Sequence, residues 1–91
     1  MGKLEKCLYI VELLSRGKGM SLKEINEHWE YSSLYDGEII PKTFGRYKDY
    51  ISNVLAIGIE YDKHFNSYYI SNLSDIKNNA IYRYLLSAFH I

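Results

Sequence analysis

Positive charge gathers in one short stretch of this chain. Residues 39–48 contain three basic side chains, Lys42, Arg46 and Lys48, and no acidic one, whereas residues 24–38 contain five acidic side chains and no Lys or Arg. A lysine ammonium binds phosphate oxygens as a point charge, and the arginine fork matches the acceptor edge of guanine. This pattern predicts contacts with phosphates and base edges. Arg46 is the predicted base reader, and Lys42 and Lys48 are the predicted phosphate contacts.

The basic stretch is predicted to open a helix over about residues 42–57. Its predicted buried face consists of apolar side chains at helical spacing, namely Phe44, Tyr47, Ile51, Val54 and Leu55. Pro41 suits the first helical position, where its missing N–H costs nothing. The positive end of the helix dipole then lies beside the basic residues and favours phosphate. Lys42, Thr43 and Arg46 are predicted to share the side opposite the apolar stripe.

Two helices are predicted before this one, over residues 3–16 and 22–31. Apolar residues recur at spacings of three and four in both, and Cys7 lies beside the first stripe, where we expect a small buried hydrophobic side chain. Ser21 and Glu24 form the S-x-x-E pattern of a capping box at the start of the second helix. These helices supply the predicted core behind the basic stretch.

After the third helix the pattern changes to β-prone runs. Residues 59–62 and 68–71 flank a polar turn and predict a hairpin. Phe65 at its tip can either wedge against a sugar or pack back beneath the turn, and packing is expected. Residues 38–40 are compatible with a further short strand. A fourth helix is predicted from Ser74 to about residue 89.

This element order predicts a winged helix-turn-helix: mainly α, with a small β-hairpin and a C-terminal helical tail. The predicted domain spans residues 3–72, and residues 73–91 form the tail. In a winged helix the third helix can enter the major groove of DNA while the hairpin touches the neighbouring backbone. The same fold also serves as a plain protein–protein interaction module, so the element order alone leaves both functions open.

Composition excludes several other classes of protein. Ninety-one residues allow one small domain, and the eleven basic and eleven acidic side chains cancel, so only their distribution can attract a charged partner. One Cys forms neither an intramolecular disulfide nor a multi-Cys zinc site, and no apolar run approaches the ~20 residues of a membrane span. The three His residues are scattered and no phosphate-binding glycine loop is present. We therefore expect a cytoplasmic protein with no membrane partner, no metal, no cofactor and no enzymatic activity.

The sequence also resembles a known family over about three-quarters of its length. The matching segments are residues 4–14, 21–27, 42–51, 58–62 and 67–70, the last two reading Gly-Ile-Glu-Tyr-Asp and Ser-Tyr-Tyr-Ile. They resemble the N-terminal winged helix-turn-helix of bacterial transcriptional regulators that carry a C-terminal WYL domain. The resemblance implies that residues 43–49 lie in a recognition helix, that residues 59–70 form the wing, and that the tail leads towards a sensor domain.

The predicted function is therefore sequence-specific binding of double-stranded DNA as the reading head of a transcriptional regulator. The expected contacts are Lys42, Thr43, Arg46 and Lys48, with Lys23, Tyr50, Lys63 and His64 as secondary contacts. The alternative is a winged-helix module that docks protein without touching DNA. Residues 32–40 make a longer connection than a tight helix-turn-helix has, and the wing contains no Arg.

The end of the chain has a separate pattern. In residues 81–91 only Arg83 is permanently charged, and apolar residues fall on nearly every side of the helical projection. A helix that is apolar on nearly every side is usually buried on more than one face. Two arrangements satisfy this and both can hold: an effector domain, absent from this chain and the only route to an effector ligand, or a homodimer, which we expect. The predicted dimer centre comprises Tyr84, Leu85, Ala88 and Phe89.

Overall fold

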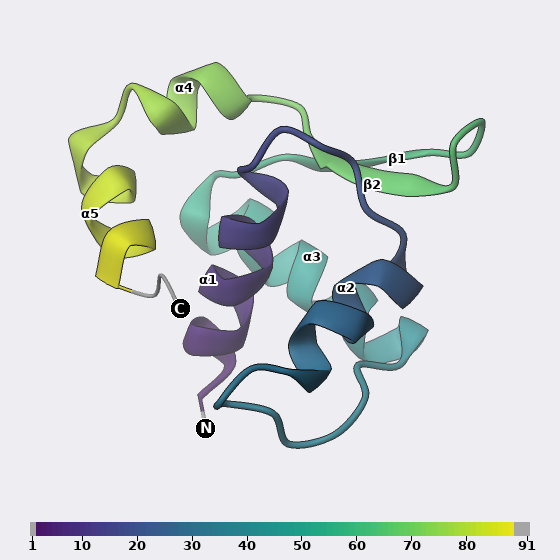
Figure 1. The fold of residues 1–91 in the computed structure, drawn as a ribbon. Helices are drawn as coiled ribbons and strands as arrows, with labels where there is room; N and C mark the ends of the chain where they lie inside the picture. The colour runs from purple at the N-terminus through teal and green to yellow at the C-terminus, as the bar shows by residue number, and fades with distance from the viewer. Residues whose placement is uncertain (1, 89–91) are drawn as a thin grey trace.

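The computed structural model describes residues 2–88 and consists of helices with one small hairpin (Figure 1). The elements are α1 (Lys3–Leu14), α2 (Leu22–Glu30), α3 (Pro41–Leu55), β1 (Ile59–Asp62), β2 (Ser67–Ile70), α4 (Leu73–Lys77) and α5 (Ala80–Ala88). The predicted fold class, a winged helix-turn-helix followed by a helical tail, is confirmed.

Local chemistry sets the ends of the helices. At the start of α2 the Ser21 hydroxyl accepts the Glu24 backbone N–H at 3.1 Å, and the Glu24 carboxylate accepts the Ser21 backbone N–H at 3.0 Å. The predicted capping box is therefore confirmed. Pro41 occupies the first turn of α3 as expected. This helix ends at Leu55, two residues earlier than predicted, because Ala56 turns into the left-handed conformation with a φ of 56°.

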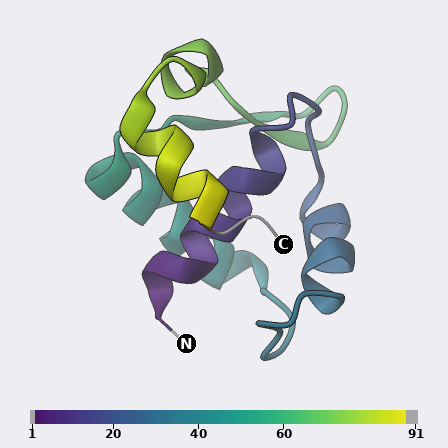
Figure 2. The same ribbon diagram turned by 60° about the vertical axis from the view of Figure 1, so that its left-hand side comes forward.

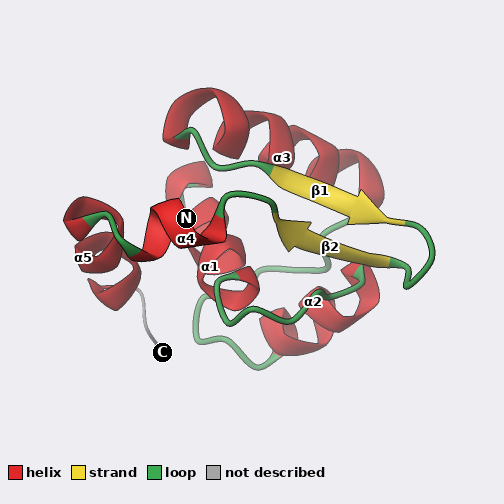
Figure 3. Ribbon diagram, turned by 90° about the horizontal axis from the view of Figure 1, so that it is seen from above, coloured by secondary structure: helices red, strands yellow, loops and turns green. Residues whose placement is uncertain are grey.

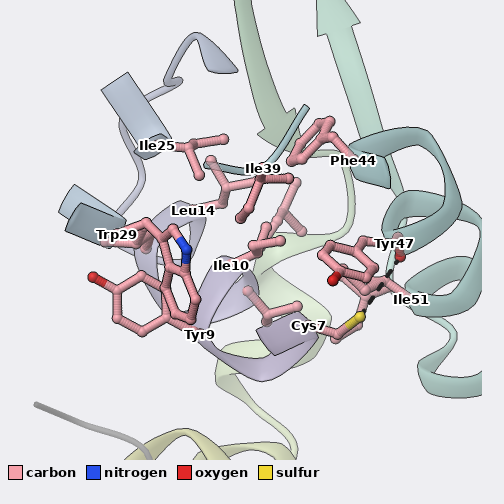
Figure 4. Close-up of a cluster of buried hydrophobic side chains, with 14 of the residues drawn as sticks. Cys7, Tyr9, Ile10, Leu14, Ile25, Trp29, Ile39, Phe44, Tyr47 and Ile51 are labelled. Carbon is pink, nitrogen blue, oxygen red and sulfur yellow. Dashed lines mark hydrogen bonds between the residues drawn. The ribbon is translucent and has the colours of Figure 1, made fainter. Parts of the chain in front are cut away.

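The central element of the core is α1. Its residues from Cys7 to Leu14 are all buried, because α2, α3, α5 and the hairpin surround the helix (Figures 1 and 3). Figure 4 shows side chains from α1, α2 and α3 meeting around Ile10. The predicted buried face of α3 is confirmed for Phe44, Tyr47 and Ile51. It is wrong for Val54, which is 60% exposed at the far end of α3.

Residues 38–40, whose sequence is compatible with a short strand, form no strand. The side-chain amide of Asn26 takes its place: the amide nitrogen donates to the Ile39 carbonyl at 2.9 Å, and the amide oxygen accepts the Ile39 N–H at 2.8 Å. With both backbone groups satisfied, Ile39 needs no partner strand. The extra partner of the hairpin is Met20, which exchanges two backbone hydrogen bonds with Tyr68 at 3.0 and 2.7 Å. The segment between α1 and α2 thus extends the sheet beyond β2.

The tail is two short helices, not the single helix predicted from Ser74 onwards. The break has a local cause, because the Asn79 side-chain oxygen accepts the backbone N–H groups of Ile81 and Tyr82 and so caps a new helix. It also has a tertiary cause. Ile76 of α4 is buried, and the Tyr82 hydroxyl of α5 donates to a backbone carbonyl at the end of α3. The turn between them lets α5 fold back along α1 (Figure 2).

Candidate nucleic-acid interface

The outer side of α3 carries an exposed polar ridge. Its members recur at the i, i+4, i+7 and i+11 spacing of one helix face and are all exposed: Lys42, Arg46, Asp49 and Asn53. The opposite side of the helix is the buried face described above. The first turn of α3 contains no acidic residue. The positive end of the helix dipole and the two cations of the ridge therefore face solvent together.

The cations of this ridge have no acidic partner in the part of the chain that the structure describes. The ion pairs found among residues 2–88 are Lys6–Asp36 at 2.6 Å and Arg16–Glu12 at 3.1 Å. Both lie on other elements. Lys42 and Arg46 are thus available to an anionic ligand, since no intramolecular carboxylate has to be displaced first.

Two predicted contact residues lie on the flank of α3 rather than on the ridge. Thr43 and Tyr50 are both half-buried. Tyr50 packs against the hydrophobic core, and the Lys3 ammonium lies 5.1 Å from the centre of its ring. Only the outer edges of these two side chains are accessible, so they border the basic surface rather than project from it.

Lys48 lies at the junction of α3 and the wing. Its ammonium is 5.2 Å from the centre of the Tyr68 ring, and that ring also contacts Phe44, with the ring centres 4.7 Å apart. On the wing itself Tyr68 pairs with Tyr61, whose ring centre is 4.9 Å away. Through the backbone, Tyr68 also holds Met20. One tyrosine therefore fastens α3, both strands and the segment before α2 into a single unit with Lys48 on its surface.

The tip of the wing is an ordered turn that projects beyond the helices (Figure 3). The Asp62 carboxylate accepts the backbone N–H groups of His64 and Phe65 at 2.9 and 3.4 Å, which fixes the turn. Lys63 and His64 are exposed, as a surface contact requires. The expected packing of Phe65 beneath the turn is wrong: its side chain is 73% exposed, and its ring contacts the His64 ring edge to face. A four-residue turn has no apolar surface beneath it to cover the ring.

Lys23 has different surroundings from the other predicted contacts. It lines an open cavity of about 480 Å³ between α2 and the connection that leads to α3. Three carboxylate side chains share this lining: Glu27, Glu30 and Glu38. The local field around Lys23 is thus negative. The structure does not bring Lys23 into the basic ridge.

Three further residues belong to the candidate interface and were not predicted. Asp49 and Asn53 lie on the ridge, and the spacing of Lys42 and Arg46, continued along the helix, would have found them. Lys18 is exposed beside the wing, because Gly19 closely approaches Ser67 at the start of β2. No local pattern places Lys18 there, since its position depends on the long-range pairing of Met20 with Tyr68.

The predicted dimer residues are only partly within the described structure. Tyr84 is 74% exposed on α5, and Ile81, one turn earlier, is 70% exposed. The side chains of Leu85 and Ala88, and all of Phe89, lie outside the described residues. Tyr84 and Ile81 therefore form an apolar surface that α1 leaves uncovered, while Tyr82 faces the core.

The single cysteine lies apart from the candidate interface. Cys7 is fully buried in α1, and its thiol donates to the Tyr47 backbone carbonyl at 3.9 Å (Figure 4). Burial raises the pKa of this thiol from 9.0 to about 11, because desolvation disfavours the thiolate. Cys7 is a core residue, as the sequence predicts.

Other kinds of site find no support in the described part of the chain. Between residues 2 and 88, no group of three or more His, Cys, Asp or Glu side chains is arranged to hold a metal ion. No helix in that range is both long enough and apolar enough to cross a membrane.

Comparison of the chain with protein-family models, curated proteins and solved structures gave no match in any of the three.

Proposed function

We propose that this chain binds double-stranded DNA sequence-specifically, as the reading head of a transcriptional regulator. One observation carries the proposal: the exposed cations at the start of α3 lie beside a wing that Tyr68 locks to the same helix. A rigid helix–wing unit of this shape can place α3 in the major groove while the wing follows the backbone. The resemblance to the DNA-binding domain of WYL-domain regulators supports the same function.

The roles of the basic residues follow from their positions. Arg46 projects from the centre of the ridge and is the proposed reader of guanine. Lys42 lies at the helix N-terminus and Lys48 at the wing junction, where each would hold a phosphate. Asp49 and Asn53 are further proposed base readers, since a carboxylate accepts from cytosine and an asparagine matches adenine. Thr43 and Tyr50 border the groove, and Lys63 and His64 would meet the backbone from the wing.

The test of this proposal is the salt dependence of binding to a random duplex, measured by fluorescence anisotropy. Three phosphate-binding cations, Lys42 and Lys48 of α3 and Lys63 of the wing, predict a slope of log K against log salt of about −2.7. Arg46→Ala should weaken binding to a selected site by ~1–3 kcal/mol and relax its specificity, whereas Lys48→Ala should weaken all sequences alike. Lys77→Ala, an exposed lysine of α4, is the control and should leave affinity unchanged.

The rival function is protein docking without DNA contact. The observation that favours it is the exposure of three aromatic side chains of the wing, Tyr61, Phe65 and Tyr69, of which Tyr61 and Tyr69 lie on opposite faces of the hairpin. A protein-docking wing predicts no measurable affinity for random duplex DNA at low salt, and equal behaviour of Arg46→Ala and Lys77→Ala. Either result would reject the DNA-binding proposal.

We further propose that two copies pair through the exposed face of α5. Ile81 and Tyr84 leave an apolar surface in water, and such surfaces mark interfaces. Paired reading heads would suit a palindromic operator with half-sites one helical turn apart. Sedimentation across micromolar concentrations tests this, with Ile81→Glu/Tyr84→Glu expected to be monomeric. A monomeric wild-type chain with α5 intact would reject the dimer and leave an effector domain as the proposed cover.

A further inference from the structure

The DNA-binding proposal leaves the cavity between α2 and the α2–α3 connection without a role. Its volume of about 480 Å³ is in the range of small-molecule sites. The lining combines apolar surface with charge and consists of Leu22, Lys23, Asn26, Glu27, Glu30, Tyr35, Glu38, Ile39 and Pro41. We propose that this cavity binds a small organic cation, an amine with an apolar body.

The walls of the cavity are held in place before any ligand arrives. The connection is fastened to α2 by the paired hydrogen bonds between Asn26 and Ile39, and by the Trp29 indole N–H, which donates to the Gly37 carbonyl at 2.8 Å. On the other side the Lys6–Asp36 ion pair ties the connection to α1. Because the cavity is already formed, none of the binding free energy of a ligand is used to order a loop.

The charge of the lining selects a cation. Glu27, Glu30 and Glu38 contribute three negative charges and Lys23 one positive charge, so the lining carries a net charge of −2. Neither ion pair of the described residues involves these carboxylates. An anionic ligand would be repelled, whereas one or two ammonium groups would be attracted in a site partly shielded from water.

The remaining lining selects an organic cation over a metal ion. Among the described residues, no group of His, Cys, Asp and Glu side chains has the arrangement of a metal site. Leu22, Ile39 and Pro41 instead offer apolar surface for a hydrocarbon body, and Tyr35 adds an aromatic ring, a group that attracts cations. The lining therefore offers both carboxylates for an ammonium group and apolar surface for the hydrocarbon part of an amine.

The cavity has a built-in reporter. Trp29 is the only tryptophan of the chain, and its ring centre is 6.1 Å from that of Tyr35. We would titrate the protein with para-xylylenediamine and follow both Trp29 emission and the backbone amide resonances of Leu22, Asn26 and Ile39. The neutral analogue para-benzenedimethanol and the dianion terephthalate have the same ring and serve as matched ligands. Saturable shifts confined to the cavity are expected for the diamine, with much weaker shifts for the other two.

Variants then separate a built site from an adventitious one. Glu27→Gln/Glu38→Gln removes two charges without changing size and should weaken diamine binding about fivefold, as expected for partly exposed ion pairs. Glu60→Gln, on the exposed surface of β1, is the control and should bind like wild type. The proposal is overturned if no saturable shift occurs below ~10 mM diamine, where binding would fall short of even the millimolar range. Equal affinity of the two variants, or equal binding of all three ligands, would also overturn it. None of these measurements involves DNA, so the result stands whether or not the chain binds DNA.

Discussion

Replacement of Tyr68 by leucine tests whether one side chain holds the wing to α3. The Tyr68 ring makes two aromatic contacts, with Phe44 and Tyr61, and one cation–π contact with Lys48. Aromatic pairs contribute about 0.5–1.5 kcal/mol each and an exposed cation–π contact about 0.5–1 kcal/mol. Because leucine retains part of the apolar contact, we expect Tyr68→Leu to lower the free energy of unfolding by about 2 kcal/mol.

The measurement is urea denaturation, paired with duplex binding. A chain of this size has an m-value of about 1 kcal/mol/M, so the midpoint should fall by about 2 M with m unchanged. Tyr69→Leu is the matched control, since Tyr69 is the next residue of β2, is 42% exposed and makes no ring contact among the described residues. It should change stability by less than about 0.5 kcal/mol. Duplex affinity should fall for Tyr68→Leu more than for Tyr69→Leu.

A second substitution isolates the ring from the hydroxyl. The Tyr68 hydroxyl makes no hydrogen bond within the described structure, so Tyr68→Phe should unfold at the same urea concentration as wild type. Equal stability losses for Tyr68→Leu and Tyr69→Leu would refute the assigned role of Tyr68. So would a large loss in Tyr68→Phe, which would show that the ring contacts are not what holds the wing.

Three further predictions concern the core and its connections. Asn26→Ala should lower the free energy of unfolding, measured by urea denaturation, by about 2 kcal/mol, because both hydrogen bonds to Ile39 are lost at about 1 kcal/mol each. Unchanged stability would mean that water replaces these hydrogen bonds. Cys7 should resist a thiol reagent at pH 8 in the native protein and react once urea unfolds it, since burial raises its pKa to about 11; fast native labelling would contradict its burial. The hydrogen bond from the Ser21 N–H lowers the pKa of Glu24 below 4.5, so its contribution to stability is present above pH 4.5 and is lost as the pH falls through the lower folded-state value. Acid should therefore destabilise wild type more than Glu24→Gln in parallel urea titrations, and identical pH profiles would refute the link.

The sequence determines the features that depend on near neighbours. The first three helices, the capping box at Ser21, the entry of α3 at Pro41 and the hairpin at residues 59–70 all rest on spacing or on local hydrogen bonds. The sequence also determines the positive charge at the start of the α3 ridge, because helical spacing alone places Lys42 and Arg46 on the side of the helix opposite the apolar stripe. The break in the tail was also readable in principle, since Asn79 is a residue that caps helices.

Tertiary structure decides what depends on partners far along the chain. Ile39 has a strand-like sequence but lies in a loop, because Asn26, thirteen residues earlier, satisfies its backbone. Met20 has no strand pattern yet extends the sheet, because the hairpin reaches it through Tyr68. Val54 fits the apolar stripe of α3 yet is 60% exposed, whereas the neighbouring Leu55 packs against the core. Periodicity states which side chains prefer burial, but the surfaces that bury them, and the backbone groups that complete each hydrogen bond, exist only once the chain has folded.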